Sequence, residues 1–399
     1  MNIILSGGWS YGNLGDEAIL MTSIKLLHDK FPKHKIIVLV YKKNETSKYL
    51  NQLEYVSIEQ SLHSLIFGIK DQNMDFGNGL LDELKTPIKR RLNNLLKPIK
   101  DNYDLYKFLK NPSKFIERYQ DKIKCFSNLC KKSNLYVMSG GGYINNWTEM
   151  IISKYCEVYI AKENNVKTCM IGQTVGPFNK IAKQVYKLIL SNIDHCFFRD
   201  IESINDTEKF GHNCLSEIIP DLALGEETIY KKENYIVFIP FLTDLNQHMD
   251  TIVENINAIV LESKCKVIIT VSQQWAWCMQ IATSFYISLK NKNINTNFII
   301  PDDYKELEKI LSSAQFVLSQ NLHGLILAYR GHTPVVCLNN RRKFVSFMKA
   351  INQMQNLIPP SNITQRNLYE CYIRRNEFDF SKCKEFQEQI NNAINQTCF

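Results

Sequence analysis

The architecture of the protein is indicated by its first forty residues, Met1–Val40, which read MNIILSGGWSYGNLGDEAILMTSIKLLHDKFPKHKIIVLV. A short apolar strand is expected at Ile3–Leu5, and it runs into a glycine-rich stretch that ends at Glu17. Apolar residues then recur at the spacing of one helix face, and Pro32 marks the end of this helix. A second apolar strand follows at Ile36–Val40. A strand, a helix and a strand in this order predict a parallel sheet with helices packed on its faces.

The same alternation continues along the chain, so the whole protein is expected to be α/β. In the first half, strands and helices are predicted at Leu135–Ser139, Thr148–Glu163, Thr168–Gly172, Lys183–Leu190 and His195–Phe198. In the second half, the predicted strands are Tyr235–Pro240, Lys266–Thr270, Asn297–Ile300, Phe316–Ser319 and Pro334–Leu338, with helices at Ile252–Leu261 and Tyr304–Ser312. A polar stretch after Leu224 predicts the domain boundary. We therefore expect one domain over residues 1–224, a second over 225–375, and a C-terminal helix within 376–399 that crosses back to the first.

Residues 60–130 interrupt the alternation and predict a helical insert in the first domain. Thr86 and Pro87 resemble a helix N-cap followed by proline at the first helical position. The apolar residues that follow form one stripe on a strongly basic helix. Twelve lysine and arginine residues against four acidic ones lie in Lys85–Lys124, an excess that equals the net charge of the whole chain, +8. The apolar stripe and the basic residues around it predict peripheral contact with the inner face of an anionic cell membrane. The alternative is an ordinary helix that packs on the domain and has a solvated face.

Composition excludes several classes of protein. The longest apolar runs are far shorter than the roughly 20 residues needed to cross a bilayer. The N-terminus carries neither a basic leader nor a small-residue cleavage site, so we expect no signal peptide and a cytoplasmic location. The 12 cysteines show no C-x-x-C spacing, which predicts buried thiols and no metal site. No nucleic-acid-binding motif accompanies the basic segment, so nucleic acid is not expected as a partner.

Several distinctive segments follow predicted strands directly, where open parallel sheets bind their ligands. The first is the loop that contains Gly12, Asn13 and Gly15 and leads to a helix start at Asp16. Glycine lets the backbone approach a ligand, and a helix N-terminus favours an anion. A tight turn with Asn13 or Asp16 as the helix cap explains the same residues. As a catalytic group, Asp16 would act as general acid or base for a hydroxyl of a sugar.

Three more candidates lie at other strand ends. The consecutive glycines Gly140, Gly141 and Gly142 favour the close approach of a ligand or of another domain. Arg199 ends the strand HCFFRD, where its guanidinium is suited to a carboxylate or a phosphate, and a salt bridge to a neighbouring acid is the alternative. His323 lies where a strand turns into an apolar helix. It is a candidate for acid–base chemistry, although a lone histidine is usually structural.

Six segments together, in this order, resemble the polysaccharide pyruvyl transferase family. They are GNLGDEAIL at Gly12–Leu20, SGGGY at Ser139–Tyr143, IGQTVGPF at Ile171–Phe178, FRDIES at Phe198–Ser203, PDLAL at Pro220–Leu224 and NLHGLILAYRGHTPVVCL at Asn321–Leu338. The resemblance implies a glycosyltransferase-B-like fold, with two Rossmann-like domains facing a cleft. It also implies phosphoenolpyruvate as co-substrate, no bound cofactor, and a glycan acceptor with two hydroxyls. The product would be a pyruvate ketal on a cell-surface polysaccharide or its lipid-linked precursor.

The same resemblance assigns roles to individual residues. Arg199 and His323 would hold the carboxylate and the phosphate of the donor, with His323 also a candidate acid. Asp16 and the glycine-rich loop around it would face the cleft, with Asp16 as base or acceptor ligand. Lys343 falls at the position of the family's lysine after the last matching strand.

The sequence departs from the family at Asn321, which stands where the family has an arginine. A neutral amide binds an anion more weakly than a guanidinium does. Either another cation (Arg330, Arg341 or Lys343) substitutes, or the donor differs, or activity is lost. Two other functions therefore stay open: a nucleotide-sugar glycosyltransferase on the same scaffold, and a non-catalytic family member that binds a glycan.

Overall fold

The computed structural model describes residues 1–9, 12–43, 50–68, 99–210 and 215–396. The chain forms two compact units. The first contains Met1–Tyr11, Ser23–Pro220 and the chain from Asn392 onward. The second contains Gly12–Thr22 and Asp221–Asn391. The loop before the first helix therefore belongs to the second unit, although the strand that precedes it belongs to the first.

Among the described residues, the first unit has a parallel sheet of eight strands. They are β1 (Asn2–Ser6), β2 (Lys35–Val40), β3 (Val56–Gln60), β4 (Ser133–Met138), β5 (Gly141–Ile144), β6 (Lys167–Val175), β7 (His195–Phe198) and β8 (Leu215–Ile218). The strand order is β3-β2-β1-β4-β6-β7-β8, and β5 pairs with β6. Between β1 and β4 the order switches direction, and ligands of open parallel sheets bind at such a switch point.

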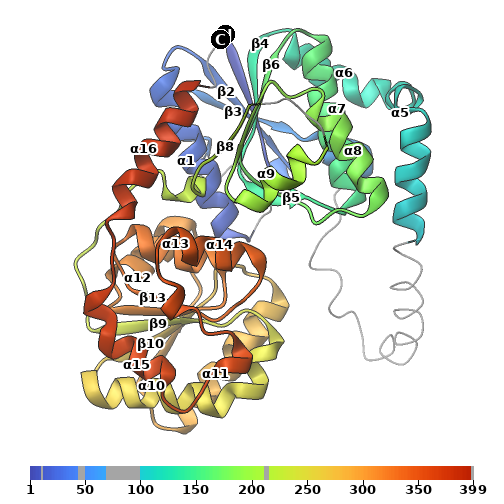
Figure 1. Ribbon diagram of the computed structural model, residues 1–399. Coiled ribbons are helices and arrows are strands. Elements are labelled where there is room, and N and C mark those ends of the chain that lie inside the picture. The colour runs from blue at the N-terminus through green and yellow to red at the C-terminus, as the bar shows by residue number, and fades with distance from the viewer. Residues whose placement is uncertain (10–11, 44–49, 69–98, 211–214, 397–399) are drawn as a thin grey trace. The chain divides into compact units, whose positions relative to one another are not determined.

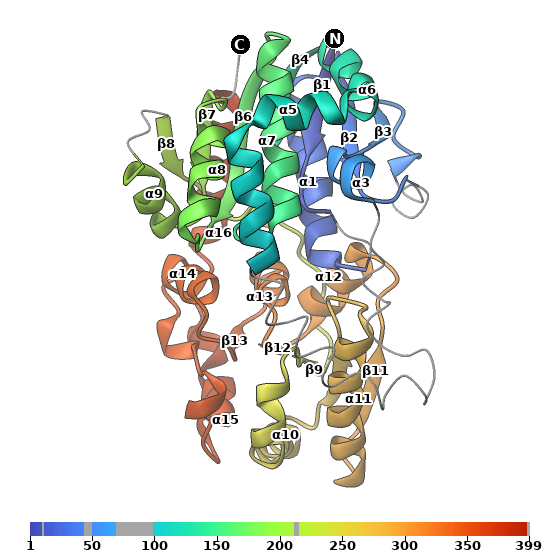
Figure 2. The same ribbon diagram turned by 90° about the vertical axis from the view of Figure 1, so that its right-hand side faces the viewer.

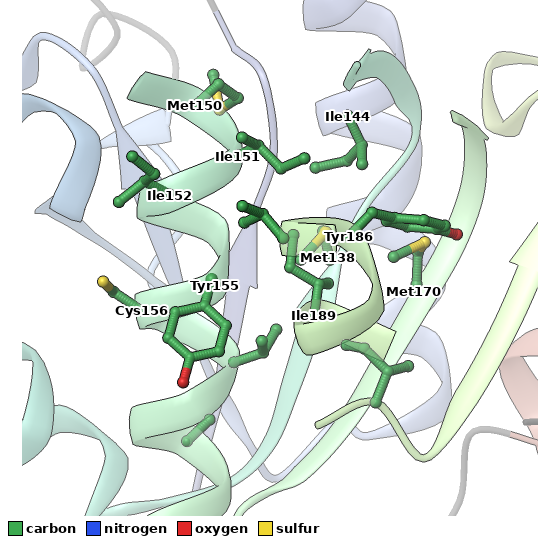
Figure 3. Close-up of a cluster of buried hydrophobic side chains, with 14 of the residues drawn as sticks. Met138, Ile144, Met150, Ile151, Ile152, Tyr155, Cys156, Met170, Tyr186 and Ile189 are labelled. Atoms are coloured by element: carbon green, nitrogen blue, oxygen red, sulfur yellow. The ribbon is translucent and has the colours of Figure 1, made fainter. Parts of the chain in front are cut away.

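Helices cover both faces of this sheet (Figure 1). The C-terminal part of α1 (Leu14–Lys30) lies on one face, and α7 (Thr148–Glu163) and α8 (Lys180–Leu190) lie on the other. Met138 and Met170 point from the strands into a core where Ile151, Tyr186 and Ile189 of these two helices meet them (Figure 3). The unit also contains α3 (Leu62–Phe67), a helix over 99–110, α5 (Pro112–Arg118), α6 (Gln120–Cys130) and α9 (Ile201–Glu208).

The second unit is a smaller version of the same design. In the described part of the chain its sheet has five parallel strands: β9 (Tyr235–Ile239), β10 (Lys266–Thr270), β11 (Thr296–Ile299), β12 (Phe316–Ser319) and β13 (Val335–Cys337). Their order, β11-β10-β9-β12-β13, places the switch point between β9 and β12. The helices α12 (Tyr304–Ser313) and α13 (Leu322–Arg330) lie on one face, and α10 (Met249–Ser263) and α11 (Ala276–Asn291) lie on the other (Figure 1, Figure 2). The later helices are α14 (Arg342–Ala350), α15 (Asn367–Ile373) and α16 (Lys382–Gln396).

The two sheets confirm the α/β class and the parallel strand arrangement that the sequence predicts. Each strand predicted above is present, and the helix predicted at Thr148–Glu163 has those bounds. Three strands were not predicted, namely β3, β5 and β8. Each has only four or five residues, and β5 begins with two glycines, which are depleted in strands.

The described parts of the predicted insert are helical. They comprise α3, the helix over 99–110, α5 and α6. The predicted cap at Thr86 and Pro87, and most of the apolar stripe that follows it, lie outside the described residues. Within the described residues, no helix is both long and apolar enough to span a membrane. Of the ten cysteines described, only Cys125 is exposed.

Candidate active site

The glycine-rich loop of the second unit is attached to the carboxyl-terminal end of β10. The Leu14 N–H donates to the Ser272 carbonyl at 2.9 Å, and the Gln274 N–H donates to the Gly12 carbonyl at 2.7 Å. Gly12 has a φ of +80°, which residues with a side chain rarely adopt. This short β-like pairing therefore fixes the loop immediately before α1.

The loop packs against His323, from the first turn of α13. A Cβ atom at Gly15 would lie 1.9 Å from His323 Nδ1, so only glycine leaves room for the imidazole. Asn13 Nδ2 donates to Asp16 Oδ2 at 2.7 Å and orients a carboxylate that the N-terminal dipole of α1 favours. The fold thus brings Asn13, Gly15 and Asp16 to the strand end that carries His323, although most of the chain separates them in sequence.

Asn321 holds the start of α13. Its Oδ1 accepts the Gly324 N–H at 3.2 Å, and its own N–H donates to Ser319 Oγ at 3.0 Å. The residue is buried, with 5% of its surface exposed. Its amide therefore acts as the N-cap of the helix that presents His323. We call Gly12, Asn13, Gly15, Asp16, Asn321 and His323 the second-unit group.

Arg199 follows β7 in the first unit and is half-buried. Its Nε donates to Thr174 Oγ1 at 2.6 Å, and the Thr174 hydroxyl donates to Asp200 Oδ2 at 2.6 Å. Asp200 in turn caps α9, because its Oδ1 accepts the Ser203 N–H at 2.9 Å. The threonine links the guanidinium to the neighbouring acid, and this chain of hydrogen bonds orients the arginine.

Of the three consecutive glycines, Gly142 lies beside this arginine, and two of the three belong to a strand and not to a loop. Gly141 and Gly142 begin β5, which pairs with β6. Gly141 has a φ of +143°, a region that favours glycine. A Cβ atom at Gly142 would lie 3.4 Å from Arg199 Nη2, so this glycine leaves space around the guanidinium. We call Gly140, Gly141, Gly142 and Arg199 the first-unit group.

The three cations that could substitute for the family's arginine differ in their burial and in their partners. Arg330 is buried, bonds Glu308 through Nε and Nη2, and donates from Nη1 to the Ala223 carbonyl at 2.6 Å. These bonds tie Ala223 to α12 and α13, so the Arg330 guanidinium already has structural partners within the second unit. Arg341 and Lys343 are exposed at the start of α14, and Lys343 Nζ lies 5.5 Å from the ring of Phe344.

Sequence reasoning missed a buried charged network next to the first-unit switch point. Lys154 and Glu157, both on α7, are almost fully buried and pair at 2.9 Å. The Lys154 ammonium also donates to Ser6 Oγ at the end of β1, and the Tyr136 hydroxyl donates to Glu157 Oε2 at 2.7 Å. Burial, and secondly the charge of Glu157, raise the pKa of Tyr136 well above its ordinary value, so the hydroxyl keeps its proton. A lysine and a glutamate three residues apart in an apolar helix were the available signal.

Among the described residues, no three His, Cys, Asp or Glu side chains are clustered so that they could hold a metal ion.

Comparison with solved structures identifies the fold. The UDP-GlcNAc 2-epimerase of Methanocaldococcus jannaschii aligns with a TM-score of 0.56 and 13% identity, over 99% of this chain and 99% of that one. The Neisseria meningitidis UDP-GlcNAc 2-epimerase bound to UDP-GlcNAc aligns with a TM-score of 0.52 and 13% identity, over 99% of this chain and 98% of that one. The Anabaena protein HepE in complex with UDP and glucose aligns with a TM-score of 0.54 and 12% identity, over 99% of this chain and 97% of that one. These identities show the fold alone, which is glycosyltransferase-B-like.

The sequence comparisons identify the family. A comparison with curated protein sequences found no significant match. The family model described as polysaccharide pyruvyl transferase matches residues 13–342, which is most of the chain. The match includes most of the second-unit group and all of the first-unit group. The chain therefore belongs to the polysaccharide pyruvyl transferase family.

Proposed function

We propose that this protein transfers a pyruvyl group from phosphoenolpyruvate to two hydroxyls of a sugar in a bacterial cell-surface polysaccharide or its lipid-linked precursor. The observation that carries the proposal is Arg199, a half-buried guanidinium at a strand end, oriented by Thr174 and given space by Gly142. A guanidinium held in this way suits the carboxylate of a small anionic donor. Family membership supports the same reaction class.

The proposed reaction gives a separate role to each candidate side chain. One sugar hydroxyl adds to C2 of phosphoenolpyruvate while the methylene carbon takes up a proton. The second hydroxyl then displaces phosphate at C2, and its proton passes to the base or to the departing phosphate. His323 would supply the proton or bind the phosphate, and Asp16 would accept a hydroxyl proton. Lys343 would contribute the positive charge that Asn321 lacks.

Calorimetric titration with phosphoenolpyruvate tests the proposal. The wild-type protein should bind it, and Arg199→Ala and His323→Ala should each weaken binding and slow transfer by at least about 100-fold. Arg199→Lys should recover little, because an ammonium cannot form the same two parallel hydrogen bonds. His195→Ala is the matched control, since His195 begins the strand that Arg199 follows. Binding of phosphoenolpyruvate that is equally strong in all four variants would refute these assignments.

A nucleotide sugar is the competing donor, and the same titration decides between the two. UDP-GlcNAc is the probe, because two of the similar structures contain it or its UDP part together with a sugar. Tight binding of UDP-GlcNAc without any heat from phosphoenolpyruvate would replace the proposed donor.

We also propose that the helix over 99–110 contacts an anionic membrane surface, where a lipid-linked acceptor would reside. Leu105 and Phe108 face the core of the first unit. Ile99, Tyr103 and Tyr106, at the spacing of one helix face, are 67%, 62% and 50% exposed. Exposed lysines accompany this apolar face, and Lys110 Nζ lies 4.9 Å from the ring of Tyr106. Apolar and aromatic side chains with nearby lysines favour a membrane interface.

A further inference from the structure

Three aromatic residues cluster at the carboxyl-terminal edge of the second-unit sheet. Phe241 follows β9, and Trp275 and Trp277 follow β10, the strand that pairs with β9. The rings of Phe241 and Trp277 have centroids 4.8 Å apart, and those of Trp275 and Trp277 are 5.8 Å apart. All three residues are half-buried. We propose that this aromatic platform binds a pyranose ring of the glycan acceptor; the inference rests on the proposed function.

Trp275 occupies a position that helix formation does not favour. Trp275 is the N-cap of α11 and makes no side-chain hydrogen bond to the helix. A serine, threonine, aspartate or asparagine at an N-cap would bond a free N–H of the first turn, and tryptophan cannot accept that bond. Asn179, Asp200, Asp303 and Asn321 form such bonds at the starts of α8, α9, α12 and α13, whereas Trp147 before α7 and Arg341 before α14 lack one, as Trp275 does.

Buried hydrogen bonds fix the platform in place. Gln320, fully buried after β12, accepts the N–H groups of Phe241 and Leu242 through Oε1 and donates to Asp244 Oδ1 at 2.6 Å. The turn that carries Phe241 is therefore tied to the switch point between β9 and β12. A site that is rigid before binding loses less entropy when the ligand arrives.

The platform adjoins the second-unit group. A Cβ atom at Gly12 would lie 3.6 Å from Gln274 Cβ and 4.0 Å from Trp275 Cδ1. The same Gly12 carbonyl accepts the N–H of Gln274, next to the platform. A sugar stacked on these rings would thus lie beside the loop that carries Asp16, the proposed base.

The chemistry of the surroundings favours a sugar over an anion. One face of a pyranose presents C–H groups, whose slight positive charge suits the negative face of an aromatic ring. The 3-10 helix Thr243–His248 begins two residues after Phe241 and exposes Thr243, Asp244, Asn246 and Gln247. Hydroxyl, amide and carboxylate groups bind sugar hydroxyls, whereas a carboxylate repels a phosphate.

Binding of sugars can be measured without the donor. The probes are methyl pyranosides of galactose, glucose, mannose and N-acetylglucosamine, followed by tryptophan fluorescence, since two of the chain's four tryptophans lie in the platform. We expect at least one probe to bind the wild type, and Trp277→Ala to weaken it about tenfold or more. Trp277→Phe should restore part of the affinity. Phe298→Ala should leave binding unchanged, because Phe298 forms a comparable pair with Tyr286 against the same core.

Trp275→Ser separates binding from stability. The serine supplies the missing cap, so the thermal midpoint should stay the same or rise while sugar affinity falls. A midpoint that falls together with the affinity would assign Trp275 a structural role and overturn the inference. It is also overturned if no probe binds the wild type, if Phe298→Ala weakens binding as much as Trp277→Ala, or if UDP alone binds the platform. The proposed function can fail separately. If sugar binding depends on Trp277 but the protein does not bind phosphoenolpyruvate, the aromatic platform is supported and phosphoenolpyruvate is refuted as the donor.

Discussion

Gly15 shows how strictly one residue can be determined by another that is distant in sequence. Its hydrogen lies where a methyl group would overlap the imidazole of His323. Alanine is a better helix former than glycine, so Gly15→Ala should not weaken α1 itself. Any loss of function must then come from displacement of His323.

We predict that Gly15→Ala lowers the rate of pyruvyl transfer nearly as much as His323→Ala does. In the double variant the two losses should not add, because both changes act on the same side chain. The measurement is transfer rate, with circular dichroism to establish that each variant is folded. Fully additive losses would show that Gly15 acts on something other than His323.

At the same scale, the chemistry of the candidate residues was readable from the sequence, but their partners were not. Arg199 and His323 stand out because a charged or titratable side chain follows an apolar strand. The hydrogen bond from Arg199 to Thr174 depends on the pairing of β7 with β6, which no local pattern encodes. The role of Asn321 as a cap was missed for a different reason: the resemblance drew attention to the charge it lacks, and not to the helix that it begins.

At the scale of the element, α7 carries two charged residues, Lys154 and Glu157, at buried positions where apolar residues are expected. The pair anchors Ser6 and Tyr136, so the helix holds the end of β1 and the middle of β4 in addition to covering the sheet. Removing one member leaves an uncompensated charge among apolar side chains.

We predict that Lys154→Met lowers the free energy of unfolding by about 3–5 kcal/mol, and that adding Glu157→Gln recovers a large part of the loss. Urea denaturation of the two single variants and the double variant measures this. The control is Lys25→Met, which removes the exposed pair with Asp29 and should cost under about 1 kcal/mol. A double variant that is less stable than either single variant would contradict the account.

Elements with a strong apolar pattern were predictable, and the weakly patterned ones were not. The strands β1 and β9 have runs of buried Ile, Leu, Val and Phe, and their positions follow directly from the sequence. The strand β3, with the sequence VSIEQ, has a single buried residue, Ile58, so its pattern resembles that of a surface loop. The strand β5 is determined by its pairing with β6 and by the φ of Gly141.

At the scale of the whole molecule, the basic excess is concentrated in one part of the chain. We predict that the protein sediments with vesicles of anionic lipid at low salt and is released as the salt concentration rises, because screening weakens charge attraction. Tyr103→Ser combined with Tyr106→Ser should reduce the bound fraction. Ile287→Ser is the control, because Ile287 is similarly exposed, on α11. Equal sedimentation with neutral lipid would remove the membrane proposal.

The sequence predicts that both sheets are parallel, but it does not predict the order of their strands or the residues that belong to each unit. Alternating strands and helices imply parallel sheets with both faces covered, and the structure has them. No pattern in the sequence shows that Gly12–Thr22 belongs to the second unit, because that assignment depends on backbone hydrogen bonds to Ser272 and Gln274.

The division of α1 between the units has a consequence for engineering and for evolution. A chimaera joined at Pro220 would take its loop from one parent and the strand end that receives it from the other. The loop over residues 12–22 and the strand end at 272–274 would then come from different parents and would match only by chance. A mismatch would shift Gly15 and thereby disturb His323, although neither residue is changed. Productive recombination between relatives should therefore require residues 12–22 and 272–274 to be inherited from the same parent.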